Sequence, residues 1–253
     1  MSPHTRQSDA LMGVYRFAEC RDTSSNATYA LRSNLIATRH IMKLYIAQAT
    51  CSLAVQAVFN ELELAPQLVH FDVFGKTTSD QSDFADVNDL LYVPALELDG
   101  ETEPLTETIT IASYIADLYP ESGLIPKHGT LERVRMDQLL TFVATEIAQK
   151  HIPLMRKLMK PEGIAFQSNK LLSTYGKLDA RLADGRSYLT GEQFTVADAY
   201  VWATMWHERS GVNLDHLKNL EAYIERIEAR ASVKKALRDE ADLVAAHKER
   251  LAA

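Results

Sequence analysis

The sequence has only two cysteines among its 253 residues, Cys20 and Cys51. Two thiols cannot build the disulfide framework on which small secreted domains depend. No Cys-x-x-Cys pair and no Cys/His group has the spacing of metal ligands, so we expect no metal. The low cysteine content favours a reducing compartment, and we predict a cytoplasmic protein.

The chain also lacks a long apolar run and an excess of basic residues. No run approaches the roughly 20 residues that a membrane-spanning helix needs, so we expect no membrane association. The net charge is −7, whereas a nucleic-acid-binding domain presents a basic face, so we expect no nucleic acid partner. Hydrophobic residues make up 46% of the chain, which is enough for one large or two modest globular domains.

The first 41 residues contain no lysine, five arginines and three acidic residues. They show no sustained hydrophobic period, and they lack the apolar core of a secretory signal. Their arginines and serines weakly resemble a mitochondrial transit peptide. We predict that residues 1–41 are a disordered or spurious extension, with Met42 as an alternative start, and we assign no role to Cys20.

Residues 42–53, with the sequence MKLYIAQATCSL, predict a strand that turns into a helix. Leu44–Ile46 is short, apolar and β-prone, and an apolar helix face begins at Leu53. Cys51 then falls in the first helical turn, where unpaired N–H groups and the helix dipole favour an anion. We therefore expect a lowered pKa for this thiol and a nucleophilic role. The alternative is a small buried residue that packs a helix start.

The pattern from residue 42 to about 121 predicts a β-α-β-α-β-β-α order, which is the order of a thioredoxin-like domain. The remaining predicted elements are a strand at 67–74, a helical turn at 83–88, a strand at 92–98, a hairpin into a strand at 102–105, and a helix that opens at 106–108 and ends at Pro120.

Residues 120–129 contain two prolines and two glycines and form a predicted linker. The following residues, 130–253, are predicted to form an all-helical domain. A helix over 131–158 contains Pro153, where we expect a kink. Thr195 and Asp198 have the spacing of a capping box at the start of a later helix.

Three motifs, in this order, resemble the glutathione transferases and most closely the bacterial beta class. They are Cys51-Ser52-Leu53-Ala54, Val93-Pro94-Ala95-Leu96 and Leu105-Thr106-Glu107. The resemblance extends from Met42 onward. It implies a thioredoxin-like domain followed by an all-helical one, glutathione as co-substrate, and a homodimer.

The resemblance also implies roles for individual residues. The Val93 backbone would pair with the cysteinyl unit of glutathione, with Pro94 in the cis form. Glu107 and Thr108, at a helix start, would hold the γ-glutamyl end. Lys76 falls where the class places a lysine that meets the glycyl carboxylate. The alternatives are a solvated loop charge for Lys76 and a helix-start acid for Glu107.

The sequence departs from the class where its members carry a histidine that faces the glutathione sulfur. Alignment puts Ala148 at that position, and His151 lies three residues further on. His151 would approach the site from another angle, or it is a surface or core histidine beside the kink.

The resemblance implies a detoxifying enzyme that adds the glutathione thiol to small electrophiles. A cysteine in place of a tyrosine or serine favours a second hypothesis, thiol–disulfide exchange through Cys51. A third hypothesis is a non-catalytic binding module with the same fold.

Overall fold

The computed structural model describes residues 42–252. The predicted extension at 1–41 and Cys20 lie outside the described residues. The described part belongs to one compact unit of the chain, Arg39–Ala253. Both predicted domains fall within this unit, so the boundaries 42–121 and 130–253 stay predictions.

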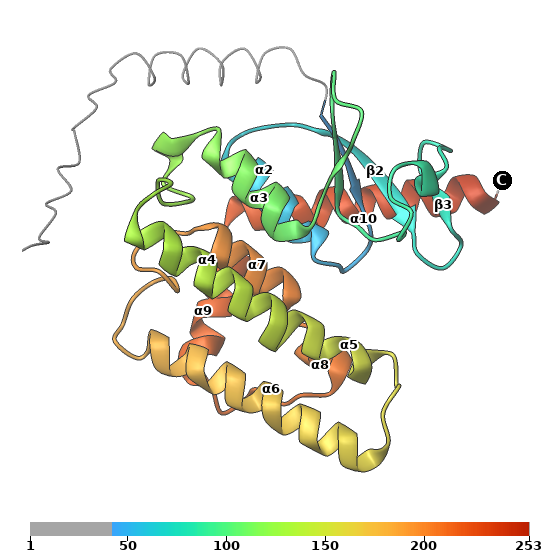
Figure 1. Ribbon diagram of the computed structural model, residues 1–253. Coiled ribbons are helices and arrows are strands. Elements are labelled where there is room, and N and C mark those ends of the chain that lie inside the picture. The colour runs from blue at the N-terminus through green and yellow to red at the C-terminus, as the bar shows by residue number, and fades with distance from the viewer. Residues whose placement is uncertain (1–41, 253) are drawn as a thin grey trace, which may run out of the picture. The chain divides into compact units, whose positions relative to one another are not determined.

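A five-stranded mixed sheet occupies the first part of this unit (Figure 1). Its order is β3-β2-β1-β4-β5, with β1 and β2 parallel and the other neighbours antiparallel. The central strand is buried on both faces, and Leu44, Tyr45 and Ile46 are all 0% exposed. The strands are β1 (Met42–Ile46), β2 (Gln67–Asp72), β3 (Thr77–Thr78), β4 (Ala95–Leu98) and β5 (Leu105–Thr106).

The two faces of the sheet are covered differently. Leu44 and Ile46 face a large core with α2 (Ser52–Glu61) and α3 (Thr108–Asp117). Tyr45 faces a small core on the other side, completed by Val69, Phe71, Phe84 and Ala95. This alternation along one strand is the period of two that separates the faces of a sheet. The thioredoxin-like fold is confirmed.

The segment between β2 and β4 differs in detail from the prediction. The expected helical turn at 83–88 is the three-residue 3-10 turn η1 (Phe84–Asp86), and the loop before it contains the short strand β3. Local side-chain hydrogen bonds shape this segment, since Asp80 accepts from Ser82 N in the loop and Asp83 caps the 3-10 turn by accepting from Ala85 N. The strand predicted at 92–98 begins only at Ala95, after Pro94, which has no N–H to donate to a ladder.

The second part of the unit is all-helical, as predicted. Its helices pack around one another and against α2 and α3 (Figure 1). They are η2 (Pro120–Ser122), α4 (Leu131–Val143), η3 (Ala144–Ala148), α5 (Gln149–Met155), α6 (Pro161–Leu182), α7 (Val196–Thr204), α8 (His207–Ser210), α9 (Lys218–Glu228) and α10 (Ala231–Ala252).

The long helix predicted at 131–158 is interrupted before its proline. Pro153 lies inside α5, and the preceding segment η3 is a π-helix. A proline removes an N–H and crowds the carbonyl four residues earlier, here that of Gln149, which directly follows the π-helical segment. The interruption lies five to nine residues before Pro153.

The predicted capping box is present at the start of α7. Thr195 N donates to Asp198 Oδ2 at 2.8 Å, and the buried carboxylate also accepts from Leu189 N and the Tyr223 hydroxyl, both at 2.9 Å. Because α7 packs against both α2 and α3, this network supports the helices at whose starts Cys51 and Glu107 lie.

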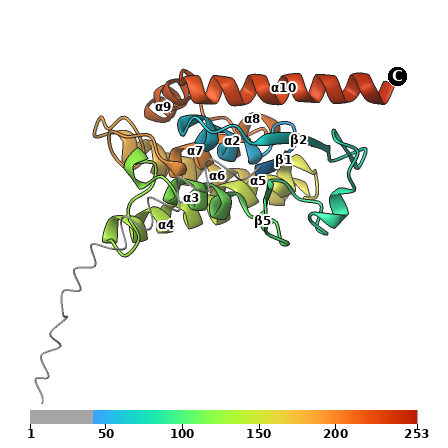
Figure 2. The same ribbon diagram turned by 90° about the horizontal axis from the view of Figure 1, so that it is seen from above.

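The last helix, α10, runs beside α2 and β2 (Figure 2). Asn60, at the far end of α2, donates to the backbone oxygen of Ser232 at 3.0 Å. Arg230 binds both carboxylate oxygens of Glu61, at 2.7 and 2.8 Å. These contacts set the direction of α10 along α2.

Candidate functional site

Cys51 lies at the junction between the β1–α2 loop and α2. It caps α2 without a side-chain capping bond, and its carbonyl accepts from Ala54 N at 3.0 Å. Its thiol donates to the carbonyl oxygen of Val93, with 3.6 Å between sulfur and oxygen. Two of the predicted site residues, 42 positions apart in the chain, are thus in contact.

The predicted lowering of the Cys51 pKa is wrong. Burial raises the pKa of this thiol above its ordinary value, and the Glu107 carboxylate raises it further. The Thr108 hydroxyl and the backbone at the helix start lower the pKa, with effects that are smaller than that of burial but larger than that of Glu107. Desolvation therefore outweighs the helix terminus. Cys51 is a neutral thiol and a hydrogen-bond donor at neutral pH.

The Val93–Pro94 peptide is cis, as the resemblance implies. Pro94 is buried, and Ala95 after it pairs with Tyr45 of the central strand. Among the described residues, the Val93 backbone has no hydrogen bond other than its contact with the thiol. Its N–H is therefore available to a ligand.

Glu107 and Thr108 open α3 beside the thiol. Glu107 is the N-cap residue, with φ of 66°, in the left-handed region that a non-glycine residue adopts at a cost of about 1–2 kcal/mol. Its side chain is exposed and makes no capping bond. Thr108 is buried, and its hydroxyl faces Cys51. The unusual backbone at Glu107 keeps a carboxylate at the rim of the thiol site.

Tyr200 of α7 is a site residue that sequence reasoning missed. It is 7% exposed, and after burial the main influences that raise its pKa are Cys51 and the Glu107 charge. Both groups are therefore close enough to act on its phenol electrostatically, which makes Tyr200 a candidate member of the site. In the sequence it follows the capping box by two residues. Helical periodicity alone does not distinguish it from an aromatic residue of the core. We call Cys51, Val93, Glu107, Thr108 and Tyr200 the Cys51 cluster.

Lys76 is not brought to this cluster by any contact in the structure. It lies in the exposed turn between β2 and β3, and its ammonium is 5.7 Å from the centre of the Phe71 ring. This cation–π contact is what a solvated loop lysine makes with a nearby aromatic side chain. The binding role that the resemblance implies for Lys76 stays a prediction.

His151 lies in the helical core. It is 0% exposed, with Nδ1 2.8 Å from Ser210 Oγ and Nε2 2.7 Å from the Tyr175 hydroxyl. Burial, with a smaller influence of His207, lowers its pKa to about 4. Both ring nitrogens are thus engaged away from the Cys51 cluster. His151 is the core histidine of our alternative interpretation.

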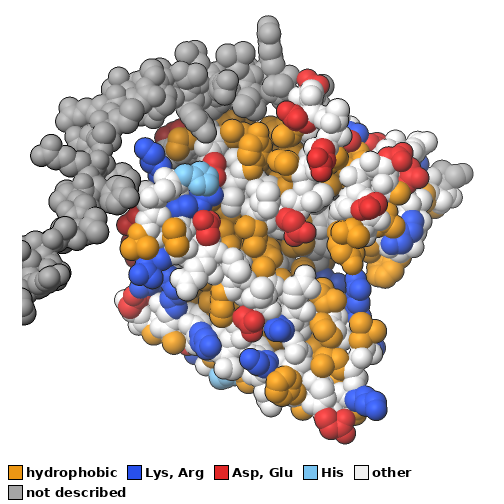
Figure 3. Space-filling model, in the orientation of Figure 1, with side chains coloured by type: hydrophobic (Ala, Val, Ile, Leu, Met, Phe, Trp, Pro, Cys, Tyr) orange, Lys and Arg blue, Asp and Glu red, His pale blue; other side chains and the backbone are white. Residues whose placement is uncertain are grey.

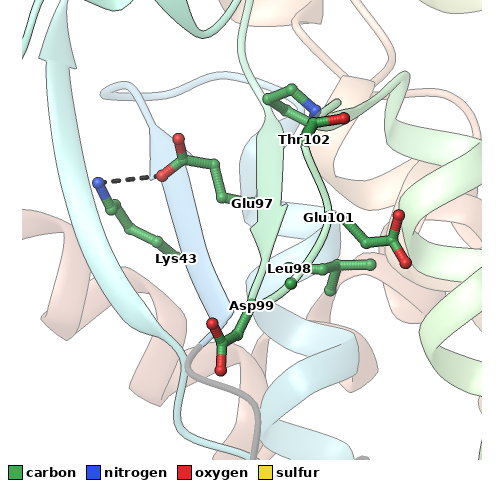
Figure 4. Close-up of a pocket in the computed structure, with 8 residues that line it drawn as sticks. Lys43, Glu97, Leu98, Asp99, Glu101 and Thr102 are labelled. Carbon is green, nitrogen blue, oxygen red and sulfur yellow. Dashed lines mark ion pairs between the residues drawn. The ribbon is translucent and has the colours of Figure 1, made fainter.

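The surface is hollowed beside the β1–α2 loop, and hydrophobic side chains flank the hollow (Figure 3). A separate depression of about 300 Å³ lies at the β4–β5 hairpin (Figure 4). Glu97 there is 3.0 Å from the Lys43 ammonium and accepts from the Tyr45 hydroxyl. This depression contains no member of the Cys51 cluster, and we assign it no role.

Two further properties concern the described residues 42–252. No group of three or more His, Cys, Asp or Glu side chains in this range could hold a metal ion. None of the helices in this range is long and apolar enough to cross a bilayer.

Comparison with known proteins places the similarity over most of the chain. Residues 149–240 match the family described as "Glutathione S-transferase, C-terminal domain". The glutathione S-transferase GstA of Escherichia coli O157:H7 is 30% identical over 197 residues, which is 78% of this chain and 97% of the relative.

Two solved structures are similar in both sequence and fold. A bacterial beta class glutathione S-transferase from Sphingomonas chungbukensis is 36% identical, with a TM-score of 0.73, over 78% of this chain and 98% of that protein. A sphingomonad glutathione S-transferase complexed with glutathione is 34% identical, with a TM-score of 0.73, over 79% of this chain and 98% of that protein. The similarity therefore spans nearly the whole length of these relatives.

Proposed function

The chain belongs to the glutathione S-transferase family, and we propose that it conjugates the glutathione thiol to small electrophiles at the Cys51 cluster. The observation that carries this proposal is the convergence of Cys51, the Val93 backbone and the start of α3 at one place. Glutathione is an extended anionic tripeptide, and these groups match its parts.

Binding would begin at the polar ends of the tripeptide. The exposed Glu107 carboxylate would accept from the γ-glutamyl ammonium, and the amides at the start of α3 would bind the adjoining carboxylate. The Val93 N–H and C=O would pair with the cysteinyl backbone as one strand pairs with the next. Lys76 remains the proposed partner of the glycyl carboxylate.

Activation follows from the protonation state of Cys51. Once the cysteinyl unit of glutathione pairs with the Val93 carbonyl, the Cys51 thiol can turn and donate to the glutathione sulfur. Its raised pKa keeps the proton on Cys51, so it acts as a donor to the glutathione thiolate. A donor aimed at a developing anion in a partly dry site stabilises that anion. The glutathione thiol releases its proton to water on binding, and the thiolate attacks the electrophilic carbon of the substrate. The new carbon–sulfur bond forms as a leaving group departs with its electron pair or, in an addition, as the substrate's π bond opens and its carbon skeleton takes up a proton from water.

Tyr200 is a second proposed donor. Its hydroxyl has no hydrogen bond to another described residue, and both Cys51 and Glu107 influence it electrostatically. In the proposed complex it would face the same sulfur or the γ-glutamyl group.

Thiol–disulfide exchange remains the alternative reaction. It would require Cys51 as the attacking thiolate, and a raised pKa leaves little thiolate at neutral pH. The protonation of Cys51 thus favours conjugation over exchange. A binding module without catalysis would keep glutathione affinity and lack both activities.

We also propose a homodimer in the cytoplasm. Phe74, on the turn after β2, is 94% exposed, and burial of this side chain in a subunit contact would remove apolar surface from water. Measuring the molar mass of the full chain by light scattering tests the dimer.

The first experiment is calorimetric titration of the full-length chain with reduced glutathione. We expect a dissociation constant between about 1 μM and a few mM, and at least an about tenfold weakening in Glu107→Ala, because a charge-assisted hydrogen bond is lost. Glu107→Gln should fall between the two, and Glu249→Ala, an exposed acid on α10, should match the wild type. No detectable heat with the wild type would overturn both enzyme hypotheses.

A further inference from the structure

The loop that leads from β1 to Cys51 contains a residue in an unfavourable backbone conformation. Ala49, two positions before the thiol, has φ of 54°. Alanine rarely adopts this left-handed region, so neighbouring groups must hold it there. The loop's own hydrogen bonds do not reach Ala49, since they join Thr50 Oγ1 to Ala47 O and to Ser52 Oγ, both at 2.8 Å.

Both polar backbone atoms of Ala49 are instead bound by side chains from the end of the chain. Ala49 N donates to Glu240 Oε1 of α10 at 3.0 Å, and Arg209 Nη1 of α8 donates to Ala49 O at 2.7 Å. The two partners lie 191 and 160 positions away in sequence. Two elements of the helical part therefore hold one residue of the loop that ends at Cys51.

A glutamate at position 240 is unfavourable for the stability of the fold. It is 6% exposed, and Oε2 has no hydrogen-bond partner among the described residues. A buried carboxyl group with one unsatisfied oxygen opposes folding, and an apolar side chain of the same size would pack there more favourably. Packing therefore gives no reason for a glutamate here, whereas the Ala49 N–H needs an acceptor.

The α2–α10 contact explains how Glu240 reaches the loop. Asn60 binds Ser232 at one end of this contact, and Ala49 binds Glu240 at the other (Figure 2). Gln56 lies one turn from both Ser52 and Asn60, on the same face of α2, and both of its amide atoms are buried without a partner. The only charged residue of α2 is Glu61, which lies at the other end of the helix from the loop and is paired with Arg230.

We propose that Glu240 and Arg209 are positioning residues, which hold Ala49 so that the Cys51 thiol faces Val93 and the bound glutathione. This inference rests on the proposed function, because it takes glutathione as the ligand of the site. The C-terminal helix then belongs to the glutathione site although it donates no group to the ligand. A purely structural contact would stabilise the fold and leave the position and reactivity of the Cys51 thiol unchanged.

The test compares Glu240→Leu with Glu240→Gln, and Arg209→Met, in the full-length chain. Glutamine keeps an oxygen acceptor for Ala49 N–H, and leucine does not. We expect Glu240→Leu to raise the KM for glutathione about fivefold or more, which is the effect of one lost hydrogen bond. The KM for the electrophile should change by less than about twofold. Glu240→Gln should restore the wild-type value, and Arg209→Met should resemble Glu240→Leu.

Matched controls are Asp242→Asn and Arg238→Met, two exposed charged residues of α10, which should behave as the wild type. If Glu240→Leu folds and keeps the wild-type KM for glutathione, the proposal is overturned. If Glu240→Leu does not fold, Arg209→Met provides the test, because Arg209 is exposed. An unchanged KM for glutathione in Arg209→Met then overturns the proposal.

A second readout needs no glutathione and separates this proposal from the proposed function. In a Cys20→Ser background, Cys51 is the sole thiol, and its rate of alkylation by iodoacetamide reports its setting. We expect a severalfold change of rate in Glu240→Leu and Arg209→Met, and wild-type rates in Glu240→Gln and both controls. If the alkylation rates change in Glu240→Leu and Arg209→Met but the wild type does not bind glutathione, the proposed function is refuted. The positioning role of Glu240 and Arg209 is then retained. Unchanged rates would refute the positioning role.

Discussion

The thiol of Cys51 donates its hydrogen bond to the carbonyl oxygen of Val93, across 3.6 Å. The donor is the group expected to act on glutathione, and the acceptor belongs to the peptide expected to bind it. Each of these two groups is thus the hydrogen-bond partner of the other. Glutathione would replace the thiol at Val93 and receive the released S–H.

The first prediction concerns the reactivity of Cys51. Because burial raises its pKa, its alkylation rate in the Cys20→Ser variant should still climb above about pH 9, where an ordinary thiol with a pKa of about 8.5 approaches its plateau. Stopped-time alkylation followed by mass spectrometry measures this. A plateau below about pH 8 would show an activated thiolate and would favour the exchange reaction.

The second prediction separates conjugation from exchange. Cys51→Ala removes one donor to the glutathione thiolate and should lower kcat/KM for conjugation by about tenfold, the worth of one hydrogen bond to a charged group. Cys51→Ser retains a donor and should lie closer to the wild type. Exchange with a glutathione mixed disulfide at the site should vanish in both variants, since neither has a thiol at position 51.

The outcome of that pair decides between the mechanisms. Complete loss of conjugation in Cys51→Ser would show that the sulfur itself reacts. Equal conjugation in Cys51→Ala and the wild type would place the thiolate's donor elsewhere, with Tyr200 as the next residue to replace by phenylalanine.

The third prediction concerns His151 and stability in acid. Its folded-state pKa is about 4, below its ordinary 6.5, so the unfolded chain binds more protons between these values. The contribution of neutral His151 to the free energy of unfolding is therefore complete above about pH 6.5. It is lost as the pH falls toward 4, by up to about 3 kcal/mol. Urea unfolding at about pH 7.5 and about pH 5 should show a smaller acid loss in His151→Gln than in the wild type.

The matched control is His216→Gln, because His216 is exposed. It should lose stability in acid as the wild type does. The KM for glutathione should stay within about twofold in His151→Gln, since both ring nitrogens are bound in the helical core. A large rise in that KM would return His151 to the site.

The fourth prediction concerns Glu240 and stability in base. Burial raises its pKa from 4.5 to about 7, so the folded chain holds a proton that the unfolded chain releases. Stability therefore falls as the pH rises from about 4.5 through 7, by up to about 3 kcal/mol. Glutamine carries no charge at any pH, so Glu240→Gln should gain stability relative to the wild type between about pH 5 and about pH 8.5.

Thermal unfolding of the wild type, Glu240→Gln and Asp242→Asn across this pH range measures the effect. The difference between Glu240→Gln and the wild type should grow with pH, and Asp242→Asn should follow the wild type. A constant difference would mean that Glu240 titrates as an exposed glutamate.

Much of the fold could be predicted because it depends on local patterns. The apolar run Leu44–Ile46 forms the central strand, and the capping box of Thr195 and Asp198 starts α7. The cis peptide before Pro94 and the position of Glu107 at a helix start agree with the motifs that resemble the family. These features involve residues close in sequence, whose spacing carries the information.

The site could be predicted in its membership better than in its chemistry. Cys51 and Thr108 are neighbours as expected, yet the pKa of the thiol moves the other way, because burial by distant elements outweighs the helix start. Tyr200 was missed because helical periodicity places it in the core without saying what it faces. For His151 the sequence left a site role and a core role open, and only the contacts of its ring nitrogens with Ser210 and Tyr175 favour the core role.

The sequence by itself determined the order of the elements, the family, and the residues that open α2 and α3. Only the tertiary structure decided which side chains hold Ala49, which groups surround the thiol, and whether its proton is retained. The physical reason is that spacing describes contacts within a few residues, whereas desolvation and the hydrogen bonds of Glu240 and Arg209 depend on elements 191 and 160 positions away.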